Sequence, residues 1–92
     1  MITSFDCRDT EAAFKGGNPA KFGNLSRVCH RKLQMLHSAH QLSDLAALPG
    51  NRLESLKHTR PGWHSIRVND KWRICFVWNN GHAQNVEIVD YH

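Results

Sequence analysis

Apolar residues between Leu25 and Ala39 recur at spacings of three and four, which is the period of an amphipathic helix. Arg27, Arg31 and Gln34 fall toward the opposite side of the same predicted helix. That polar side suits either solvent or a face for RNA or a protein partner. The apolar side of the helix is formed by Leu25, Val28, Cys29, Leu33 and Leu36.

The second half of the chain changes to the patterns that are typical of strands. The segment from Trp63 to Phe76 predicts two strands joined by a tight turn at Asn69-Asp70. A second turn is predicted at residues 79–81, which read Asn-Asn-Gly, and a last strand from Ala83 to Tyr91. Upstream, the weak alternation from Arg52 to Lys57 predicts a strand with a bulge, followed by a loop over residues 58–62.

The first fifty residues predict one short strand and three helices. The segment from Ile2 to Phe5 favours a strand. Asp6 or Asp9 is expected to cap a helix with its body at residues 10–14, which the Gly-Gly-Asn-Pro run at residues 16–19 ends. After the long helix, the segment from Gln41 to Leu48 predicts a short helix that Pro-Gly at residues 49–50 ends.

These elements predict an α+β fold in a single domain over residues 1–92. Two N-terminal helices are expected to cover one face of a small, twisted, mostly antiparallel sheet, because an apolar helix stripe and an apolar sheet face bury each other. A chain of 92 residues suits one modest hydrophobic core.

Positive charge is concentrated in one part of the chain. The formal net charge is +4, with a sequence pI near 9.3. Residues 49–73 hold six Lys and Arg residues against two acidic ones, and no Lys or Arg follows Arg73. A local excess of cations suits nucleic acid or an acidic protein, although a solubilising surface has the same composition.

Cysteine and histidine usage bears on the compartment and on metals. Three widely spaced cysteines include no C-x-x-C pair, which argues against a zinc knuckle and favours free thiols in a reducing compartment. His37 and His40 share a predicted helix face without a third ligand, so we expect no metal and no cofactor. We see no signal peptide and no apolar run long enough for a membrane helix, and we expect a cytoplasmic protein without a membrane partner.

The sequence ends in Asp90-Tyr91-His92, which combines a carboxylate, a phenol and an imidazole after an apolar strand. Metal-free RNA cleavage needs a proton acceptor for the 2′-OH, fixed cations for the phosphate and a proton donor for the leaving oxygen. An imidazole such as that of His92 titrates near neutral pH and can transfer protons. Arg73 and Lys57 are groups of the kind that stabilise phosphate charge.

The run L-x-x-L-K-x-x-R-x-G-x-x-S-I-R-V-N-D-K-W-R-I-C-F from Leu53 to Phe76, with V-E-I-V-D-Y-H at residues 86–92, resembles the HigB group of the RelE/ParE toxin superfamily. The resemblance implies a RelE-like toxin domain and the toxin half of a type II toxin–antitoxin pair. It further implies a ribosome-dependent endoribonuclease that cuts mRNA in the A site by 2′-OH attack, leaving a 2′,3′-cyclic phosphate.

The resemblance also assigns roles to single residues. It makes Arg73 the contact to the scissile phosphate and Asp90, Tyr91 and His92 the terminal catalytic group. Lys57 matches a catalytic lysine that only some members have. The predicted RNA contacts are Arg52, Arg60 and Arg67.

One position departs from part of the group, because some members have a histidine where this chain has Glu54. The general base therefore stays open between His92, Glu54 and Lys57.

The partners implied are a HigA-type antitoxin with a helix-turn-helix domain, and the ribosome with its A-site mRNA. Operator DNA would be bound only through the antitoxin. Two other readings stay open, a ParE-like toxin that acts on DNA gyrase without cutting RNA, and a passive RNA- or protein-binding module.

Overall fold

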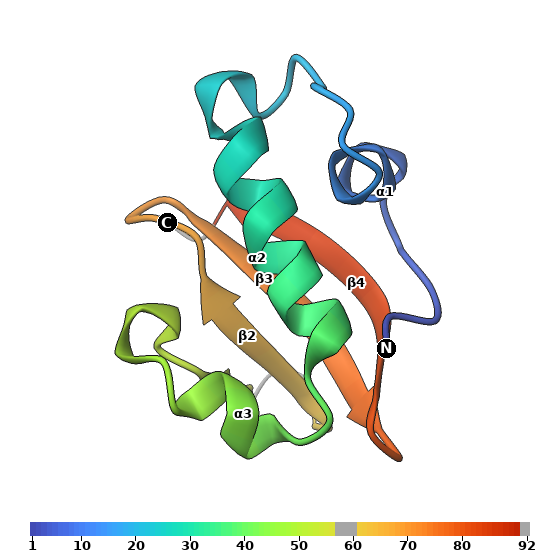
Figure 1. Cartoon of the computed structure of the whole chain (residues 1–92), viewed down its shortest axis with the longest axis vertical. Helices are drawn as coiled ribbons and strands as arrows, with labels where there is room; N and C mark the ends of the chain where they lie inside the picture. The colour runs from blue at the N-terminus through green and yellow to red at the C-terminus, as the bar shows by residue number, and fades with distance from the viewer. Residues whose placement is uncertain (57–60, 91–92) are drawn as a thin grey trace.

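The structure, a computed structural model, describes residues 1–56 and 61–90. Its centre is a four-stranded sheet in the order β1-β2-β3-β4, with every neighbouring pair antiparallel. The helices α1 and α2 lie on one side of this sheet (Figure 1). The predicted α+β fold is confirmed. The elements are α1 Arg8–Phe14, η1 Gly23–Leu25, α2 Ser26–Ser38, α3 Leu42–Ala46, η2 Pro49–Asn51, β1 Glu54–Ser55, β2 Trp63–Arg67, β3 Trp72–Asn79 and β4 His82–Asp90.

Both predicted turns join neighbouring strands, and each has a local cause. Between β2 and β3, the Asn69 side-chain oxygen accepts hydrogen bonds from the backbone N–H groups of Lys71 and Trp72, at 2.9 and 2.7 Å. Between β3 and β4, Asn80 and Gly81 have φ angles of 51° and 81°. This left-handed pair is the backbone that two-residue hairpins favour, and Asn-Gly adopts it at low cost.

The long predicted helix is confirmed as α2, which begins at Ser26 and ends at Ser38. Its residues Cys29, Leu33 and Leu36 are fully buried. The helix lies over one face of the sheet, which we call the helix-packed face (Figure 1), and these three residues belong to one hydrophobic core with the apolar residues of the strands. The helix-packed face is formed by Ile66 in β2, Ile74 and Phe76 in β3, and Ile88 in β4, all at most 1% exposed.

The opposite side of the sheet follows from the alternation of strand side chains. In β2 and β3, the residues between those of the helix-packed face are Ser65, Arg67, Arg73 and Cys75, and the register pairs Ser65 with Cys75 and Arg67 with Arg73. We call these four residues the arginine face. A buried arginine on a sheet needs hydrogen-bond partners, so the surroundings of this face decide what it does.

The N-terminal segment differs from its prediction. Residues 2–5 do not form a strand; Ile2 and Phe5 make two separate parallel bridges to Ala83 and Val86 in β4. The cause is an extra residue in β4, where the pairing with β3 shifts by one and Asn85 takes a left-handed φ of 55°. The Asn85 backbone N–H donates to the Ser4 hydroxyl at 2.8 Å, so the bulge itself holds the N-terminal segment.

The predicted cap of the first helix is also wrong. The cap position of α1 is Cys7, which makes no side-chain cap hydrogen bond. Asp6 instead accepts a hydrogen bond from the Asn85 side-chain amide at 2.9 Å, and Asp9 lies inside the first turn of α1. The carboxylate at residue 6 is therefore used to fix the bulge in β4 rather than to begin a helix.

The segment before β2 is shorter and less regular than predicted. The short helix α3 covers Leu42–Ala46 and begins where Asp44 accepts hydrogen bonds from two backbone N–H groups, those of His40 and Gln41. The predicted strand over residues 52–57 is reduced to Glu54–Ser55 within the described residues. Arg52 precedes it with a left-handed φ of 43°, so the chain turns there instead of extending. The two residues of β1 pair with β2 without a register shift, so the predicted bulge is not found in them.

Candidate functional site

Arg73 is the buried cation of the arginine face, with 7% of its surface exposed. Strand alternation turns it away from α2, and the β2–β3 register brings Ser65 beside it on the same face. The Arg73 Nε donates to the Ser65 hydroxyl at 2.9 Å, and Nη2 donates to the Ser65 carbonyl at 3.3 Å. One residue of β2 thus accepts bonds from two nitrogens of the guanidinium.

A backbone carbonyl from outside the sheet also accepts a hydrogen bond from Arg73. Nη2 of Arg73 also donates to the carbonyl of Arg52 at 2.6 Å. The left-handed turn at Arg52 follows Asn51, whose side chain is fully buried. The Asn51 amide accepts from Lys32 Nζ at 2.6 Å and donates to the Leu45 carbonyl at 3.1 Å. Asn51 therefore fixes the turn that places the Arg52 carbonyl.

Glu54 contributes charge to the same place. Its Oε1 lies 3.8 Å from Nη1 of Arg73. The Glu54 side chain is 54% exposed and that of Arg73 only 8% exposed, so the carboxylate lies at the solvent side of the buried guanidinium. A nearby carboxylate offsets part of the cost of burying the guanidinium charge.

A shallow hollow of about 190 Å³ opens beside these groups. Three of the residues predicted as catalytic or RNA-binding line it together, Arg52, Arg67 and Arg73. The two acidic residues of the hollow are Glu54 and Asp70, and Asp70 pairs with Arg67. Three cations against two carboxylates leave one positive charge, which suits a single phosphodiester.

Asp90 is not brought to Arg73 by the sheet. The cross-strand partner of Arg73 in β4 is Val89, while Asp90 pairs with Trp72. Alternation therefore places the Asp90 side chain on the side of Trp72, and its carboxylate lies 3.7 Å from Lys71 Nζ. The other predicted site residues, Lys57, Arg60, Tyr91 and His92, lie outside the described residues.

The sequence reasoning missed two residues of this site, Ser65 and Asn51. The signal for Ser65 was present, because a polar residue two positions before Arg67 must share its face of the strand. Asn51 gave no comparable signal, since its role depends on Lys32 and Leu45 meeting it in space. Glu54 had been considered as a base, and the structure places it beside Arg73.

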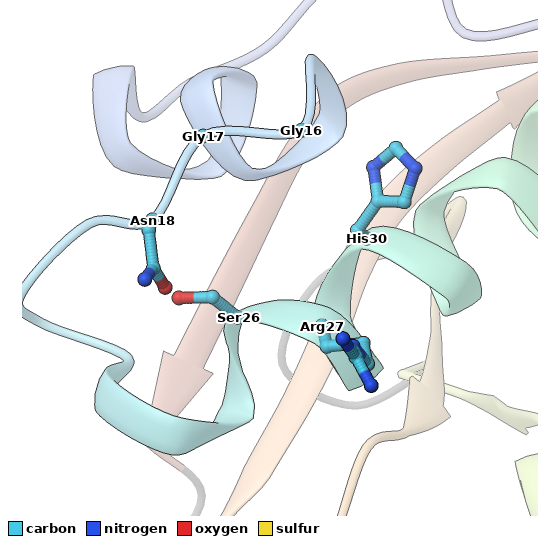
Figure 2. A pocket seen from close by; sticks show the side chains of 6 residues that line it. All are labelled: Gly16, Gly17, Asn18, Ser26, Arg27 and His30. Atoms are coloured by element: carbon cyan, nitrogen blue, oxygen red, sulfur yellow. The ribbon is translucent and has the colours of Figure 1, made fainter.

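A larger hollow, of about 410 Å³, lies between the end of α1 and the start of α2 (Figure 2). One arginine, Arg27, lines it, and none of the predicted catalytic or RNA-binding residues does. The His30 ring donates through Nδ1 to the Ala13 carbonyl at 3.0 Å, so one of its nitrogens is used in packing α2 against α1. We therefore take the smaller hollow at Arg73 as the candidate site. The lining residues of the larger one are Gly16, Gly17, Asn18, Ser26, Arg27 and His30.

The cysteines and His37 can now be placed in the fold. Cys29 and Cys75 are buried, as predicted, whereas Cys7 is half-buried. Burial raises the pKa of the Cys29 thiol to about 11, so it stays protonated at neutral pH. His37 Nδ1 accepts the Ile2 backbone N–H at 3.1 Å.

None of the helices in the described part of the chain has the length and apolar character that a membrane span requires.

Comparison with known proteins points to one family. Residues 18–92 match the family model described as a RelE-like toxin of the type II toxin–antitoxin system HigB. The chain is 44% identical over 62 residues to Toxin HigB-1 of Vibrio cholerae serotype O1, a match that spans 67% of this chain and 65% of that protein. It is 34% identical to Endoribonuclease HigB of Proteus vulgaris over 100 aligned positions that cover both chains completely.

Two further matches bear on length and fold. An uncharacterized protein of Haemophilus influenzae is 35% identical over 63 residues, 68% of this chain and 62% of that one. The matches to the Vibrio and Haemophilus proteins thus span slightly less than two thirds of those relatives. The solved YoeB dimer from Staphylococcus aureus has a TM-score of 0.56 at 18% identity, covering 99% of this chain and 97% of that one. At this identity the likeness supports the fold alone.

Proposed function

Since the chain belongs to the family of HigB-like, RelE-like toxins of type II toxin–antitoxin systems, we propose that it is an endoribonuclease that cleaves translated mRNA in the ribosomal A site. Type II toxins have a protein antitoxin as partner. The proposed antitoxin here is of the HigA type, with a helix-turn-helix domain that alone contacts operator DNA. Action on translated mRNA places the proposed activity in the cytoplasm.

The observation that carries the proposal is the buried Arg73 at the hollow lined by Arg52 and Arg67. A guanidinium held in place before the substrate arrives stabilises developing phosphate charge without reorganising. Because Arg73 is buried, water screens its charge less than that of an exposed arginine, and this stabilisation is stronger. Support for RNA as the substrate comes from the Proteus vulgaris relative, which is Endoribonuclease HigB.

The proposed reaction is an in-line attack of the 2′-OH on the adjacent phosphorus. The P–O2′ bond forms as the P–O5′ bond breaks, which leaves a 2′,3′-cyclic phosphate and a free 5′-OH. Arg73 would bind the non-bridging oxygens, with Lys57, Arg60 and the exposed Arg52 as further cations along the RNA. No metal is part of this scheme.

His92 takes part in the proposed proton transfers, and Glu54 and Lys57 are the other candidates. His92 is the proposed donor to the leaving 5′-oxygen, with Tyr91 stacking on a base. The proposed acceptor for the 2′-OH proton is His92, Glu54 or Lys57, and Glu54 gains support from its position 3.8 Å from Arg73. Asp90, which faces Lys71, would order the end of β4 rather than touch the phosphate.

Primer extension on an mRNA with ribosomes present and then absent tests the proposal. We expect cuts within codons only when ribosomes translate the message. Arg73→Ala should lower the cleavage rate by about 100- to 1,000-fold, as loss of a fixed oxyanion donor does in other enzymes. His92→Gln should also abolish growth inhibition.

Arg31→Ala is the matched control, because Arg31 is an exposed arginine of α2 and does not line the hollow. It should cleave like the wild type. A toxin that arrests growth without cutting mRNA, or an Arg73→Ala variant that cuts normally, would refute the proposal. Inhibition of DNA gyrase in place of cleavage would favour the ParE-like reading.

A further inference from the structure

Ser65 has no assigned role in the reaction, yet it makes two of the hydrogen bonds that hold Arg73. We propose that Ser65 is a positioning residue, which sets the plane of the Arg73 guanidinium for phosphate binding. This inference rests on the proposed function, because it concerns the same site. Ser65 would touch Arg73 and not the RNA.

The contacts of Ser65 fix how the Arg73 guanidinium is oriented, whereas the positive charge itself does not depend on Ser65. The Arg73 side chain is anchored at Nε by the Ser65 hydroxyl, at 2.9 Å, and at Nη2 by the Ser65 carbonyl, at 3.3 Å. Two contacts on different nitrogens of a planar group fix its plane as well as its position. Ser65 is itself fully buried in the centre of the sheet, between β1 and β3, so it offers a rigid support.

The chemistry of a hydroxyl suits this task. A serine oxygen accepts an N–H bond while staying neutral, so it orients the guanidinium without cancelling its positive charge. A carboxylate at the same place would bind more strongly but would compete with the phosphate for that charge. In this site the only carboxylate within 4 Å of Arg73 among the described residues is that of Glu54, which is mostly exposed.

Nη2 also donates to the Arg52 carbonyl, so this nitrogen has an acceptor that does not depend on the Ser65 hydroxyl. Without the Ser65 hydroxyl, Nε loses that acceptor, while Nη2 keeps the carbonyl oxygens of Arg52 and Ser65. The guanidinium can then rotate about that retained end. Displacements of about 1 Å at a reacting centre reduce rates by up to about 100-fold.

The test compares Ser65→Ala with Ser65→Thr, which keeps the hydroxyl and suits a strand. Cleavage of ribosome-bound mRNA is measured in single turnover, over a range of toxin concentrations. We expect Ser65→Ala to lower the maximal rate about 10- to 100-fold with little change in the half-saturating concentration. Ser65→Thr should stay within about threefold of the wild type. Thermal unfolding of each variant controls for folding.

The same Ser65→Ala change in a second variant distinguishes a role in positioning Arg73 from a general effect on the structure. In an Arg73→Lys protein, which lacks the planar fork, Ser65→Ala should change the residual rate by less than about twofold. Equal effects of Ser65→Ala in both backgrounds would overturn the inference. So would a Ser65→Ala protein that cleaves like the wild type, or a loss of rate that Ser65→Thr fails to prevent.

A readout without RNA keeps this inference distinct from the proposed function. The Arg73 Nε–H proton should exchange with water more slowly in the wild type than in Ser65→Ala, as followed by ¹⁵N NMR. If the wild type cuts no RNA but the exchange differs, the nuclease proposal fails and the positioning contact stands. An unchanged exchange rate overturns the positioning role whatever the activity.

Discussion

The two faces of the sheet are built from the same strands but are held together differently. On the helix-packed face, Ile66, Ile74, Phe76 and Ile88 are stabilised by losing contact with water, which requires volume and apolarity but no particular partner atom. On the arginine face, the buried Arg73 requires oxygen atoms at defined places. The helix-packed face therefore requires apolar residues of suitable volume, whereas the arginine face requires acceptor atoms at particular positions.

This difference predicts how each face responds to change. A truncated side chain on the helix-packed face leaves a cavity, so the cost appears as lost stability. A changed partner on the arginine face leaves the fold standing and misplaces one guanidinium, so the cost appears as lost activity. The predictions below are ordered by the size of the expected effect and test this division.

Phe76→Ala should have the largest effect on stability. Phe76 is fully buried in the same core as the apolar residues of α2, and removal of a buried phenyl ring costs about 3–5 kcal/mol of unfolding free energy. Urea denaturation followed by circular dichroism measures it. Val77→Ala, on the adjacent and half-buried position of the same strand, is the control and should cost about 1 kcal/mol. Equal costs at both positions would contradict the division between the faces.

Asn51→Ala should have an intermediate effect, because Asn51 links the two regions. It joins Lys32 and the Leu45 carbonyl and fixes the turn before Arg52. Truncation leaves these polar groups without partners, for a cost of about 1–3 kcal/mol. The same urea experiment with the exposed Asn18→Ala as control would show it. A cost equal to that of the control would mean that water replaces the amide.

The sequence predicted the parts of the fold that depend on neighbours along the chain. The periodicity of α2 and the Asn-Gly turn at residues 80–81 are local, and both are found where they were expected. The N-terminal segment was misjudged because it is fixed by Asn85, which is 81 residues away from Ser4. No local pattern records such a contact.

The candidate site shows the same limit. Arg73 was identified by its residue type and by the family resemblance, and it does lie at a hollow lined by Arg52 and Arg67. The Arg52 carbonyl that holds Arg73 was not foreseen, since every residue has a carbonyl and only the left-handed turn makes this one useful. The type of side chain in the sequence was enough to argue for the function of Arg73, whereas the position of its guanidinium depends on the backbone around it.

Glu54→Gln should change stability only slightly. Its contact with Arg73 is 3.8 Å long and the Glu54 side chain is 54% exposed, so solvent and salt screen the pair. We expect a loss of at most about 1 kcal/mol in urea denaturation, and less at high salt. Lys15→Gln, which removes the exposed pair with Glu11, is the control for a surface ion pair. A loss well above that of the control would show that Glu54 acts as a buried partner of Arg73.

The smallest expected effect is a pH dependence at the edge of the helix-packed face. His64 stacks on Phe76 with ring centres 6.0 Å apart, and burial lowers its pKa below the usual value of about 6.5. Between the lowered pKa and 6.5 the unfolded chain binds more protons at this residue than the folded one, so stability must fall as the pH drops through that window. The chain has six other histidines, so the informative quantity is the difference between the wild type and His64→Gln. We expect the stability of the wild type relative to His64→Gln to decrease from pH 7 to pH 5, as measured by urea denaturation at each pH. A difference that stays constant would mean that the imidazolium of His64 is as well solvated in the fold as in the unfolded chain.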